Sequence, residues 1–126
     1  HGGGPIDPAM MEERLDRMLK HMYVEIDATD AQKQKIDPIV KQAAKDMQPL
    51  RAKVREARLE GMKLFSADSI DRAAIERFRV EQIGATDAAS KRFTQALADV
   101  AEVLTPEQRK TLAARIGRRG HGRFPG

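Results

Sequence analysis

The sequence predicts an all-α fold of four helices, two of them long, and three observations lead to this prediction. Apolar residues make up 40% of the 126 residues but aromatic residues only 4%, a composition that favours helices over sheets. Apolar residues also recur at alternating steps of three and four, which is the spacing of one helix face. Finally, the helix start signal T-x-x-Q occurs twice.

The two ends of the chain are predicted to lie outside the helical domain. The lead, residues 1–9, begins with HGGGPIDP and is too rich in Gly and Pro for regular structure, so we expect it to be flexible. Residues 118–126 combine Gly with Arg and predict a disordered basic tail. A single helical domain is therefore expected over residues 10–117.

The first helix is expected from about Pro8 to Ile26. Its apolar positions are spaced by three or four residues and form one stripe, which consists of Met11, Leu15, Met18, Met22 and Ile26. The segment DATD that follows interrupts the pattern.

The second helix is predicted to start after Thr29 with a capping box. The Thr29 hydroxyl can accept a hydrogen bond from the backbone N–H of Gln32, and the Gln32 side chain can accept one from the Thr29 N–H, which is worth about 1 kcal/mol. Pro38 and Pro49 each remove a backbone hydrogen bond, so we expect a bent helix. The helix carries an unbroken apolar seam over four heptads: Ile36, Val40, Ala43, Met47, Leu50, Val54, Ala57, Gly61 and Leu64.

The third helix is expected over residues 72–103, after a turn with the sequence FSADSID and with Asp71 as its N-cap. One extra step of four occurs in its apolar pattern near Phe93. The predicted seam is Ile75, Phe78, Gln82, Ala85, Ala89, Phe93, Ala96, Val100 and Val103.

The fourth helix is predicted to start with the second T-x-x-Q box, formed by Thr105 and Gln108 and preceded by Leu104. Pro106 occupies the first helical position, where a missing N–H costs nothing. We expect this helix to cover about residues 106–116 and to end at Gly117.

The length of the second helix argues for association. At 1.5 Å per residue it would span roughly 50 Å, more than a compact chain of this size offers. A thin, elongated and bent hairpin of two long helices leaves much of its apolar surface in water. We therefore expect a second copy to cover part of that surface in a homodimer.

Positive charge is concentrated in two stretches of the chain. The formal net charge is +4, but residues 33–63 carry +5 and residues 108–126 carry +6, whereas residues 1–32 carry −4 and residues 64–107 carry −3. The basic character therefore belongs to the second helix and the C-terminal end.

Basic and apolar residues alternate along the second helix and predict a surface that binds other polypeptides. Positive charge speeds the encounter with acidic, partly unfolded chains, and Met side chains adapt to many apolar shapes. The alternative interpretation is a solvated helix face with methionines in the core. The candidate client-binding residues are Lys41, Lys45, Met47, Arg51, Arg55, Arg58, Leu59 and Met62.

The three histidines predict no defined metal site. His21 and Glu25 are four residues apart and could share one ion, but zinc sites use three or four ligands. His1 and His121 complete the set of weak candidates. We therefore expect no cofactor, with zinc as the alternative.

Catalysis and nucleic-acid binding receive little support from the sequence. No G-x-S-x-G, phosphate-loop or H-E-x-x-H pattern occurs, so we expect a protein that is not an enzyme. Arginines at the C-terminal end resemble a phosphate-binding arm, but only Phe124 could stack on a base, and residues 1–107 carry −2. No nucleic-acid partner is expected.

With two T-x-x-Q boxes in a helical chain that lacks cysteine, the sequence resembles the Spy/CpxP family of periplasmic chaperones, which is described by an LTxxQ motif. The copy from Leu104 to Gln108 matches this motif in full. The first copy matches at Thr29 and Gln32 but has Ala28 in place of the leucine. Residues 65–75 also look like the family's turn between its long helices, and the resemblance covers about residues 10–117.

The resemblance implies a cradle-shaped antiparallel dimer of four-helix chains that acts in the periplasm as an ATP-independent chaperone. Its clients would be unfolded or aggregation-prone envelope proteins. The alternative that the resemblance implies is an accessory regulator of an envelope-stress sensor kinase, in some relatives one that binds zinc. The sequence shows no signal-peptide pattern at His1, so the periplasmic location that the resemblance implies would require an export signal that has been removed.

Overall fold

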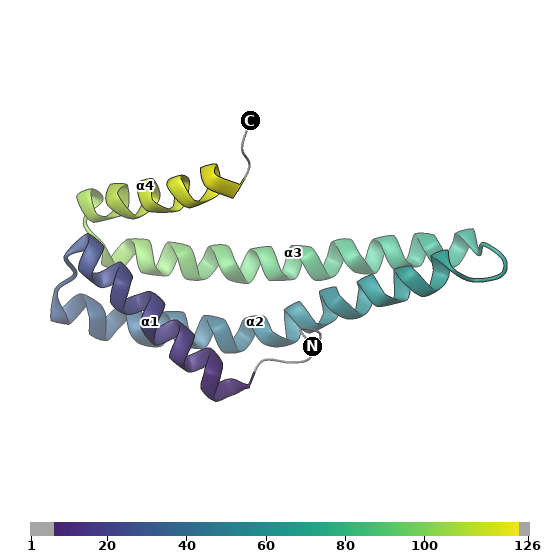
Figure 1. Cartoon of the computed structure of the whole chain (residues 1–126), viewed down its shortest axis with the longest axis horizontal. Coiled ribbons are helices and arrows are strands. Elements are labelled where there is room, and N and C mark those ends of the chain that lie inside the picture. Colours follow the sequence, from purple (N-terminus) through teal and green to yellow (C-terminus); the bar gives the residue numbers. More distant parts are fainter. Residues whose placement is uncertain (1–6, 124–126) are drawn as a thin grey trace. The chain divides into compact units, whose positions relative to one another are not determined.

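The computed structural model describes the backbone of residues 7–123 and the side chains of residues 7–118. Four α-helices follow one another in this part of the chain, which contains no strand (Figure 1). They are α1 (Pro8–Ile26), α2 (Asp30–Phe65), α3 (Arg72–Val103) and α4 (Pro106–Arg123). The predicted all-α fold is confirmed. No helix of the described part is both long enough and apolar enough to cross a membrane.

The chain folds as two compact units. The terminal unit consists of residues 1–41 and 98–126, and the hairpin unit consists of residues 42–97. Both long helices, α2 and α3, contribute to each unit.

Polar side chains cap the starts of the helices, as the sequence predicts for α2, α3 and α4 but not for α1. Asp7 caps α1, because its carboxylate accepts from the backbone N–H of Ala9 at 3.0 Å, and Pro8 takes the first helical position. Asp71 caps α3 by accepting from the backbone N–H of Ala74 at 3.1 Å. The starts of α2 and α4 follow the two T-x-x-Q boxes.

The end of α1 has a left-handed residue that the sequence did not reveal. Asp27 has φ 53° and is the one non-glycine residue of the described chain with a positive φ. The N–H of Asp27 donates to Val24 O at 3.3 Å, and that of Ala28 to Tyr23 O at 3.0 Å. This pair of bonds is a Schellman motif, which usually places glycine at the left-handed position.

The core of the terminal unit is built from the C-terminal half of α1, the start of α2 and the end of α3. Its buried residues are Leu19, Met22, Tyr23, Ile26, Ile36, Val100 and Leu104. The predicted stripe of α1 is correct at Met22 and Ile26 but wrong at Met18, which is 43% exposed. Leu19 and Tyr23 are buried instead, because they lie on the same helix face as Met22 and Ile26.

Polar contacts between α1 and α2 surround this core. The Tyr23 hydroxyl donates a hydrogen bond to the Asp37 carboxylate, and the Lys33 ammonium lies 5.9 Å from the centroid of the Tyr23 ring. Further along the same two helices, Lys41 Nζ is 3.2 Å from Asp16 and 3.6 Å from Glu12. The hydrogen bond that Lys41 donates to the Asp16 carboxylate raises the pKa of the Lys41 ammonium.

In the hairpin unit, α2 and α3 pack along the predicted seams. α2 is one continuous helix through Pro49, and its seam residues from Ala43 to Leu64 are all buried or partly buried. Gly61 allows the closest approach, because a Cβ atom at this position would lie 2.6 Å from the ring of Phe78. A larger residue would push that ring away from its place in the seam.

Phe93 is a wrong assignment in the predicted seam of α3. Its side chain is 56% exposed, and Arg92 occupies the place in the seam. Arg92 Nε donates to the Asp46 carboxylate at 2.9 Å, and Gln42 donates to the other oxygen of that carboxylate at 2.9 Å. With Arg92 in the seam, the step after Ala89 is three residues instead of the predicted four, and the arginine pairs with a carboxylate of α2.

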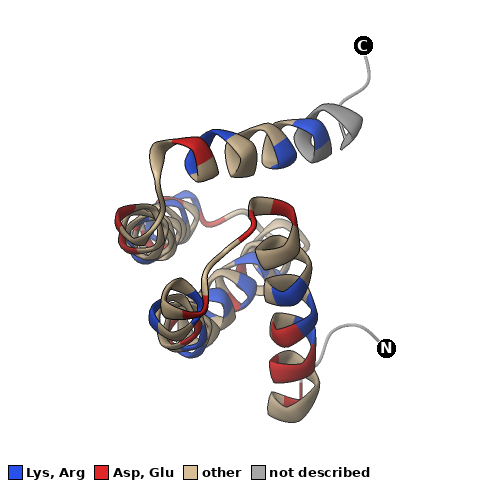
Figure 2. Cartoon of the chain, turned by 90° about the vertical axis from the view of Figure 1, so that its left-hand side faces the viewer, with Lys and Arg blue, Asp and Glu red and all other residues tan. Residues whose placement is uncertain are grey.

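The predicted end of α4 at Gly117 is also wrong, because the helix runs on to Arg123. A single helical glycine costs about 1 kcal/mol relative to alanine, which weakens a helix without ending it. Much of the predicted tail is therefore helical, while residues 124–126 lie outside the described residues. Figure 2 shows, in the coloured part of α4, an acidic residue near the start of the helix and Lys and Arg after it.

Candidate functional site

Both T-x-x-Q segments form complete capping boxes. At the start of α2, Thr29 N donates to Gln32 Oε1 at 2.9 Å, and Gln32 N donates to Thr29 Oγ1 at 3.1 Å. At the start of α4, Thr105 N donates to Gln108 Oε1 at 2.9 Å, and Gln108 N donates to Thr105 Oγ1 at 3.2 Å. Each box supplies partners for the N–H groups that a helix start leaves unpaired.

The two glutamines of these boxes also bind each other. Gln32 Nε2 donates to Gln108 Oε1 at 2.7 Å, and Gln108 Nε2 donates to Gln32 Oε1 at 2.9 Å. The second hydrogen of each amide goes to the end of another helix: Gln32 Nε2 is 3.2 Å from Val103 O, and Gln108 Nε2 is 3.2 Å from Ile26 O. We call this arrangement the glutamine pair.

The glutamine pair joins four helix ends at one place in the terminal unit. Each amide oxygen accepts two hydrogen bonds and each amide nitrogen uses both of its hydrogens, with Gln108 Nε2 also 3.4 Å from Asp27 O, so both amides are fully used. The carbonyls that receive the outer bonds belong to the last residues of α1 and α3, which have no partner within their own helices. The two motifs therefore hold the starts of α2 and α4 to the ends of α1 and α3.

The sequence predicted two separate caps and missed their pairing. A signal was nevertheless present, because a capping box accepts either Glu or Gln at its last position but only Gln can donate from its side chain. Leu104 lies in the core at 4% exposure, while Ala28, at the matching position of the first box, is only partly buried. The first box thus has the smaller apolar anchor that the sequence indicated.

Glu25 and His21, two of the weak candidates for metal binding, have different environments. Glu25 belongs to α1 and forms ion pairs with two residues of α4, Arg115 at 3.3 Å and Arg118 at 2.9 Å. His21 is exposed. The described residues contain no group of three or more His, Cys, Asp or Glu that could hold an ion, and His1 and the side chain of His121 lie outside what the structure describes.

The predicted client-binding residues separate into two groups. Lys41 belongs to the terminal unit, where it is bound to Asp16 and Glu12, and Met47 is partly buried in the seam. Lys45 is exposed on the side of α2 that faces away from the seam. Lys41 and Lys45 therefore lie apart from the other candidates, whereas Met47 lies one helical turn before Arg51.

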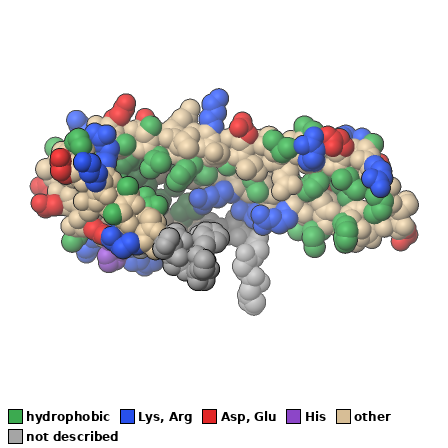
Figure 3. Space-filling view, turned by 90° about the horizontal axis from the view of Figure 1, so that it is seen from above, with side chains coloured by type: hydrophobic (Ala, Val, Ile, Leu, Met, Phe, Trp, Pro, Cys, Tyr) green, Lys and Arg blue, Asp and Glu red, His purple; other side chains and the backbone are tan. Residues whose placement is uncertain are grey.

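The other candidates form a continuous row on one flank of α2. Arg51, Arg55, Arg58 and Met62 follow one another at steps of four, three and four, with Leu59 beside them. Phe65, which the sequence assigned to the turn, continues the row and is 82% exposed. We call this row the α2 stripe: Arg51, Arg55, Arg58, Met62 and Phe65. Figure 3 shows hydrophobic side chains at the surface beside Lys and Arg near the end that carries the turn between α2 and α3.

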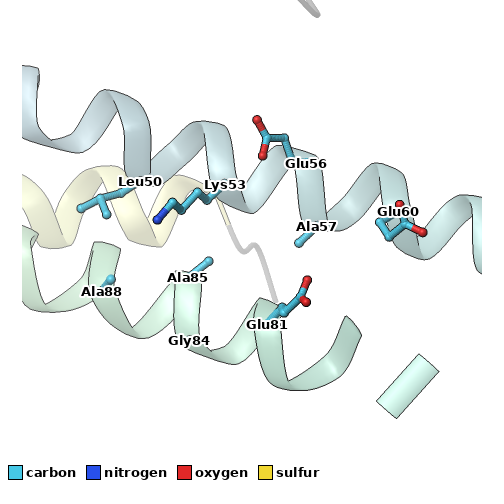
Figure 4. A pocket seen from close by; sticks show the side chains of 9 residues that line it. All are labelled: Leu50, Lys53, Glu56, Ala57, Glu60, Glu81, Gly84, Ala85 and Ala88. Atoms are coloured by element: carbon cyan, nitrogen blue, oxygen red, sulfur yellow. The ribbon is translucent and has the colours of Figure 1, made fainter. Parts of the chain in front are cut away.

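The opposite face of the hairpin unit carries an acidic groove that the sequence did not predict (Figure 4). It is an open groove of about 510 Å³ between α2 and α3. Its floor is made mainly of small residues, which leave open space between α2 and α3, and carboxylates and Lys53 stand at its edges. The residues that line it are Leu50, Lys53, Glu56, Ala57, Glu60, Glu81, Gly84, Ala85 and Ala88.

Comparison with known families gives a match over most of the chain. The family model described as LTXXQ motif family protein matches residues 9–115, which include both capping boxes and the whole hairpin unit. Comparisons with curated proteins and with solved structures each found no match. Because the family model covers more than half of the sequence, the chain belongs to the LTXXQ motif family, the family of Spy/CpxP-like periplasmic proteins.

Proposed function

We propose that this protein is an ATP-independent chaperone that binds unfolded or aggregation-prone envelope proteins in the periplasm. The observation that carries the proposal is the α2 stripe, in which three arginines lead into two exposed apolar side chains. Met62 and Phe65 are 67% and 82% exposed, which is far more than core residues of a monomer would be. Exposed apolar surface with a charged border is typical of sites that bind other polypeptides.

The chemistry of the stripe suits weak and reversible binding. The arginines attract acidic segments over a distance set by the ionic strength, so that clients are captured early. Met62 then offers a flexible, polarisable side chain that adapts to apolar groups of different shape. Release needs no nucleotide, because a client that has folded buries its own apolar residues and loses its affinity for the stripe.

A homodimer supports the same function. Apolar residues of the terminal unit remain exposed in the single chain, among them Val24 at 78% and Ile116 at 55%. We propose that a second copy covers part of this surface in an antiparallel arrangement and leaves both α2 stripes accessible. Sedimentation at micromolar concentration is expected to give the mass of a dimer, and the mass of a monomer would contradict this part of the proposal.

The chaperone proposal is tested by charge reversal of the arginines. The protein at an equimolar ratio is expected to suppress light scattering by a denatured, unrelated client in the absence of ATP. The variant R51E/R55E/R58E should lose most of this activity at low salt, because the attraction becomes repulsion. Full activity of that variant would show that clients bind elsewhere.

A matched control comes from α1. Arg14, Arg17 and Lys20 are exposed and form no ion pair within the described residues, so R14E/R17E/K20E changes the net charge by the same amount. This control is expected to keep the activity. Equal loss in both variants would mean that only net charge matters.

Membership of the LTXXQ motif family favours one alternative, an accessory regulator that docks on an envelope-stress sensor kinase. Such a regulator would recognise one partner and would suppress aggregation of unrelated clients poorly. The same scattering assay therefore separates the two functions. Specific zinc binding would favour this alternative. It is tested by calorimetric titration with zinc, in which a saturable heat would show a specific site and its absence would show none.

A further inference from the structure

A second exposed stripe lies on α3 beside the α2 stripe. Like the α2 stripe, it follows steps of three and four, so its side chains line one flank of the helix. Ile83, Phe93 and Leu97 are 55%, 56% and 46% exposed, and the residues between them are small and polar. We call it the α3 stripe: Ile83, Thr86, Ser90, Phe93 and Leu97.

The two stripes belong to the same face of the hairpin unit. The acidic groove marks one face, with Lys53 and Glu60 from α2 and Glu81 from α3 at its edges. On each helix the stripe lies on the other side of the packed seam from these residues, as the helical repeat requires. A shallow hollow along α3, lined by Gln82, Ile83, Thr86, Asp87 and Ser90, lies on this second face.

The antiparallel register gives this face a basic centre and apolar ends. Gly61 lies against Phe78, and Asp46 pairs with Arg92, so the residues facing each other across the seam are fixed. In this register the arginines of α2 lie level with the Ile83 half of the α3 stripe. Met62 and Phe65 extend beyond them toward the turn, and Phe93 and Leu97 extend in the opposite direction.

The arginines at the centre have no counter-charge. Arg51, Arg55 and Arg58 form no ion pair within the described residues, although they lie three or four positions apart on one helix. Like charges at this spacing destabilise a helix by about 0.2–0.5 kcal/mol per pair. An anionic partner would remove that repulsion and cover the apolar ends in the same step.

We propose that this face binds a client segment as an amphipathic α-helix with acidic residues at its centre and apolar residues toward both ends. The inference rests on the proposed function and specifies which conformation of the client the stripes accept. Two helices packed side by side leave a groove into which a third helix fits, and the contacts then recur every three or four residues on all of them. The face is long enough for a helix of roughly 20 residues.

An extended client segment fits the same face less well for two reasons. Its side chains on one side recur every 6.6–6.8 Å, whereas contacts along a helix recur about every 5–6 Å, so the two patterns fall out of step. An extended segment would also place its backbone N–H and C=O groups against helix side chains, where no backbone partner is available. A helical segment satisfies those groups internally.

The proposal is tested with two fluorescent peptides of roughly 20 residues, each with apolar ends and a glutamate-rich centre. The first is composed of good helix formers, and the second has the same charge and apolar residues but two interior prolines. The first peptide is expected to bind the full chain at least about tenfold more tightly in fluorescence anisotropy, a difference of 1.4 kcal/mol. Its circular dichroism should become helical on binding.

Variants locate the binding and separate this inference from the proposed function. F65A/F93A should weaken binding of the helical peptide by about tenfold, which corresponds to the loss of 1.4 kcal/mol. Because Ile70 and Val80 lie outside both stripes and are also exposed, the control I70A/V80A should leave binding unchanged. Client aggregation is measured with the same samples.

Each outcome decides one of the two claims. Equal affinity for both peptides, or equal binding by F65A/F93A and I70A/V80A, would overturn the helical mode. If aggregation is still suppressed in that case, the chaperone proposal stands without the helical mode. If suppression is absent as well, the proposed function itself is wrong.

Discussion

Gln32 and Gln108 form a reciprocal amide pair, with Nε2–Oε1 distances of 2.7 and 2.9 Å, although they lie 76 positions apart in the sequence. Each glutamine also completes the capping box of its own helix and donates to the last carbonyl of another. The repeated motif is therefore explained by a contact between its two copies. A single T-x-x-Q box would cap one helix, whereas two boxes fix the terminal unit.

The first prediction concerns the donor capacity of Gln108. Q108E keeps the acceptor for the Thr105 N–H but removes the bonds that Nε2 donates to Gln32 and to the end of α1, and it brings a carboxylate next to Gln32 Oε1. We expect the free energy of unfolding to fall by about 2 kcal/mol in urea denaturation. Q34E adds the same charge at an exposed position near the start of α2 and should change it little. Equal stability of both variants would contradict a structural role for the pair.

The left-handed conformation at Asp27 predicts a stabilising substitution. Only glycine adopts φ 53° without a steric cost, and Asp27 also places a negative charge at the C-terminal end of α1. D27G should therefore raise the free energy of unfolding by about 0.5–1 kcal/mol. D27A removes the charge but retains the Cβ atom, so it should be less stable than D27G in the same denaturation experiment. The reverse order would show that the backbone conformation is not the cause.

The environment of Tyr23 predicts that the stability of the fold depends on pH, and the absorbance of this one side chain can report it. Burial raises the pKa of the Tyr23 phenol well above its ordinary value of 10, and the hydrogen bond to Asp37 and the charge of Asp37 raise it further. Because the folded-state pKa is the higher one, this stabilisation is complete below pH 10 and is lost as the pH rises above it.

The measurement for Tyr23 is an absorbance titration of the phenolate. Tyr23 is the only tyrosine and the chain has no tryptophan, so the signal is unambiguous. In urea the phenolate should appear near pH 10, and in the folded protein only when the chain unfolds at higher pH. Y23F should lose this component of the alkaline destabilisation. Titration near pH 10 in the folded protein would show that Tyr23 is not held by Asp37.

Two glycines of the hairpin unit predict opposite responses to the same substitution. A Cβ atom added at Gly84 would meet nothing within 4 Å beyond the backbone of its own helix, so G84A should stabilise the helix by about 1 kcal/mol. At Gly61 the added methyl group would lie 2.6 Å from the Phe78 ring. G61A should therefore be less stable than G84A by about 1–3 kcal/mol in thermal or chemical denaturation. Equal stability would mean that the seam is loosely packed at Phe78.

Local signals predicted the helices well because their causes lie within a few residues. The starts of α2, α3 and α4 depend on side chains that bond to the next turn, so Thr29, Asp71 and Thr105 could be assigned from the sequence. The end of α4 was harder to assign, because Gly117 can end a helix or lie within it. That choice depends on the residues beyond it.

The site was predicted less completely because it depends on contacts between distant residues. The sequence places Lys41 near the arginines and so grouped it with them, but Lys41 forms an ion pair with Asp16 of α1. Phe93 and Arg92 are neighbours at an irregular step of the seam, and only the position of Asp46 decides which of them faces inward. The pairing of Gln32 with Gln108 likewise requires the packed helices.

The central claim, that clients bind the α2 stripe, is tested most directly by site-specific photo-crosslinking. A benzophenone side chain placed at Met62 samples the stripe, and one placed at Val80 samples an equally apolar position outside it, because these residues are 67% and 55% exposed. With an unfolding client and no ATP, we predict strong crosslinks from position 62 and weak ones from position 80. Equal yields from the two positions, or a stronger yield from position 80, would contradict the account.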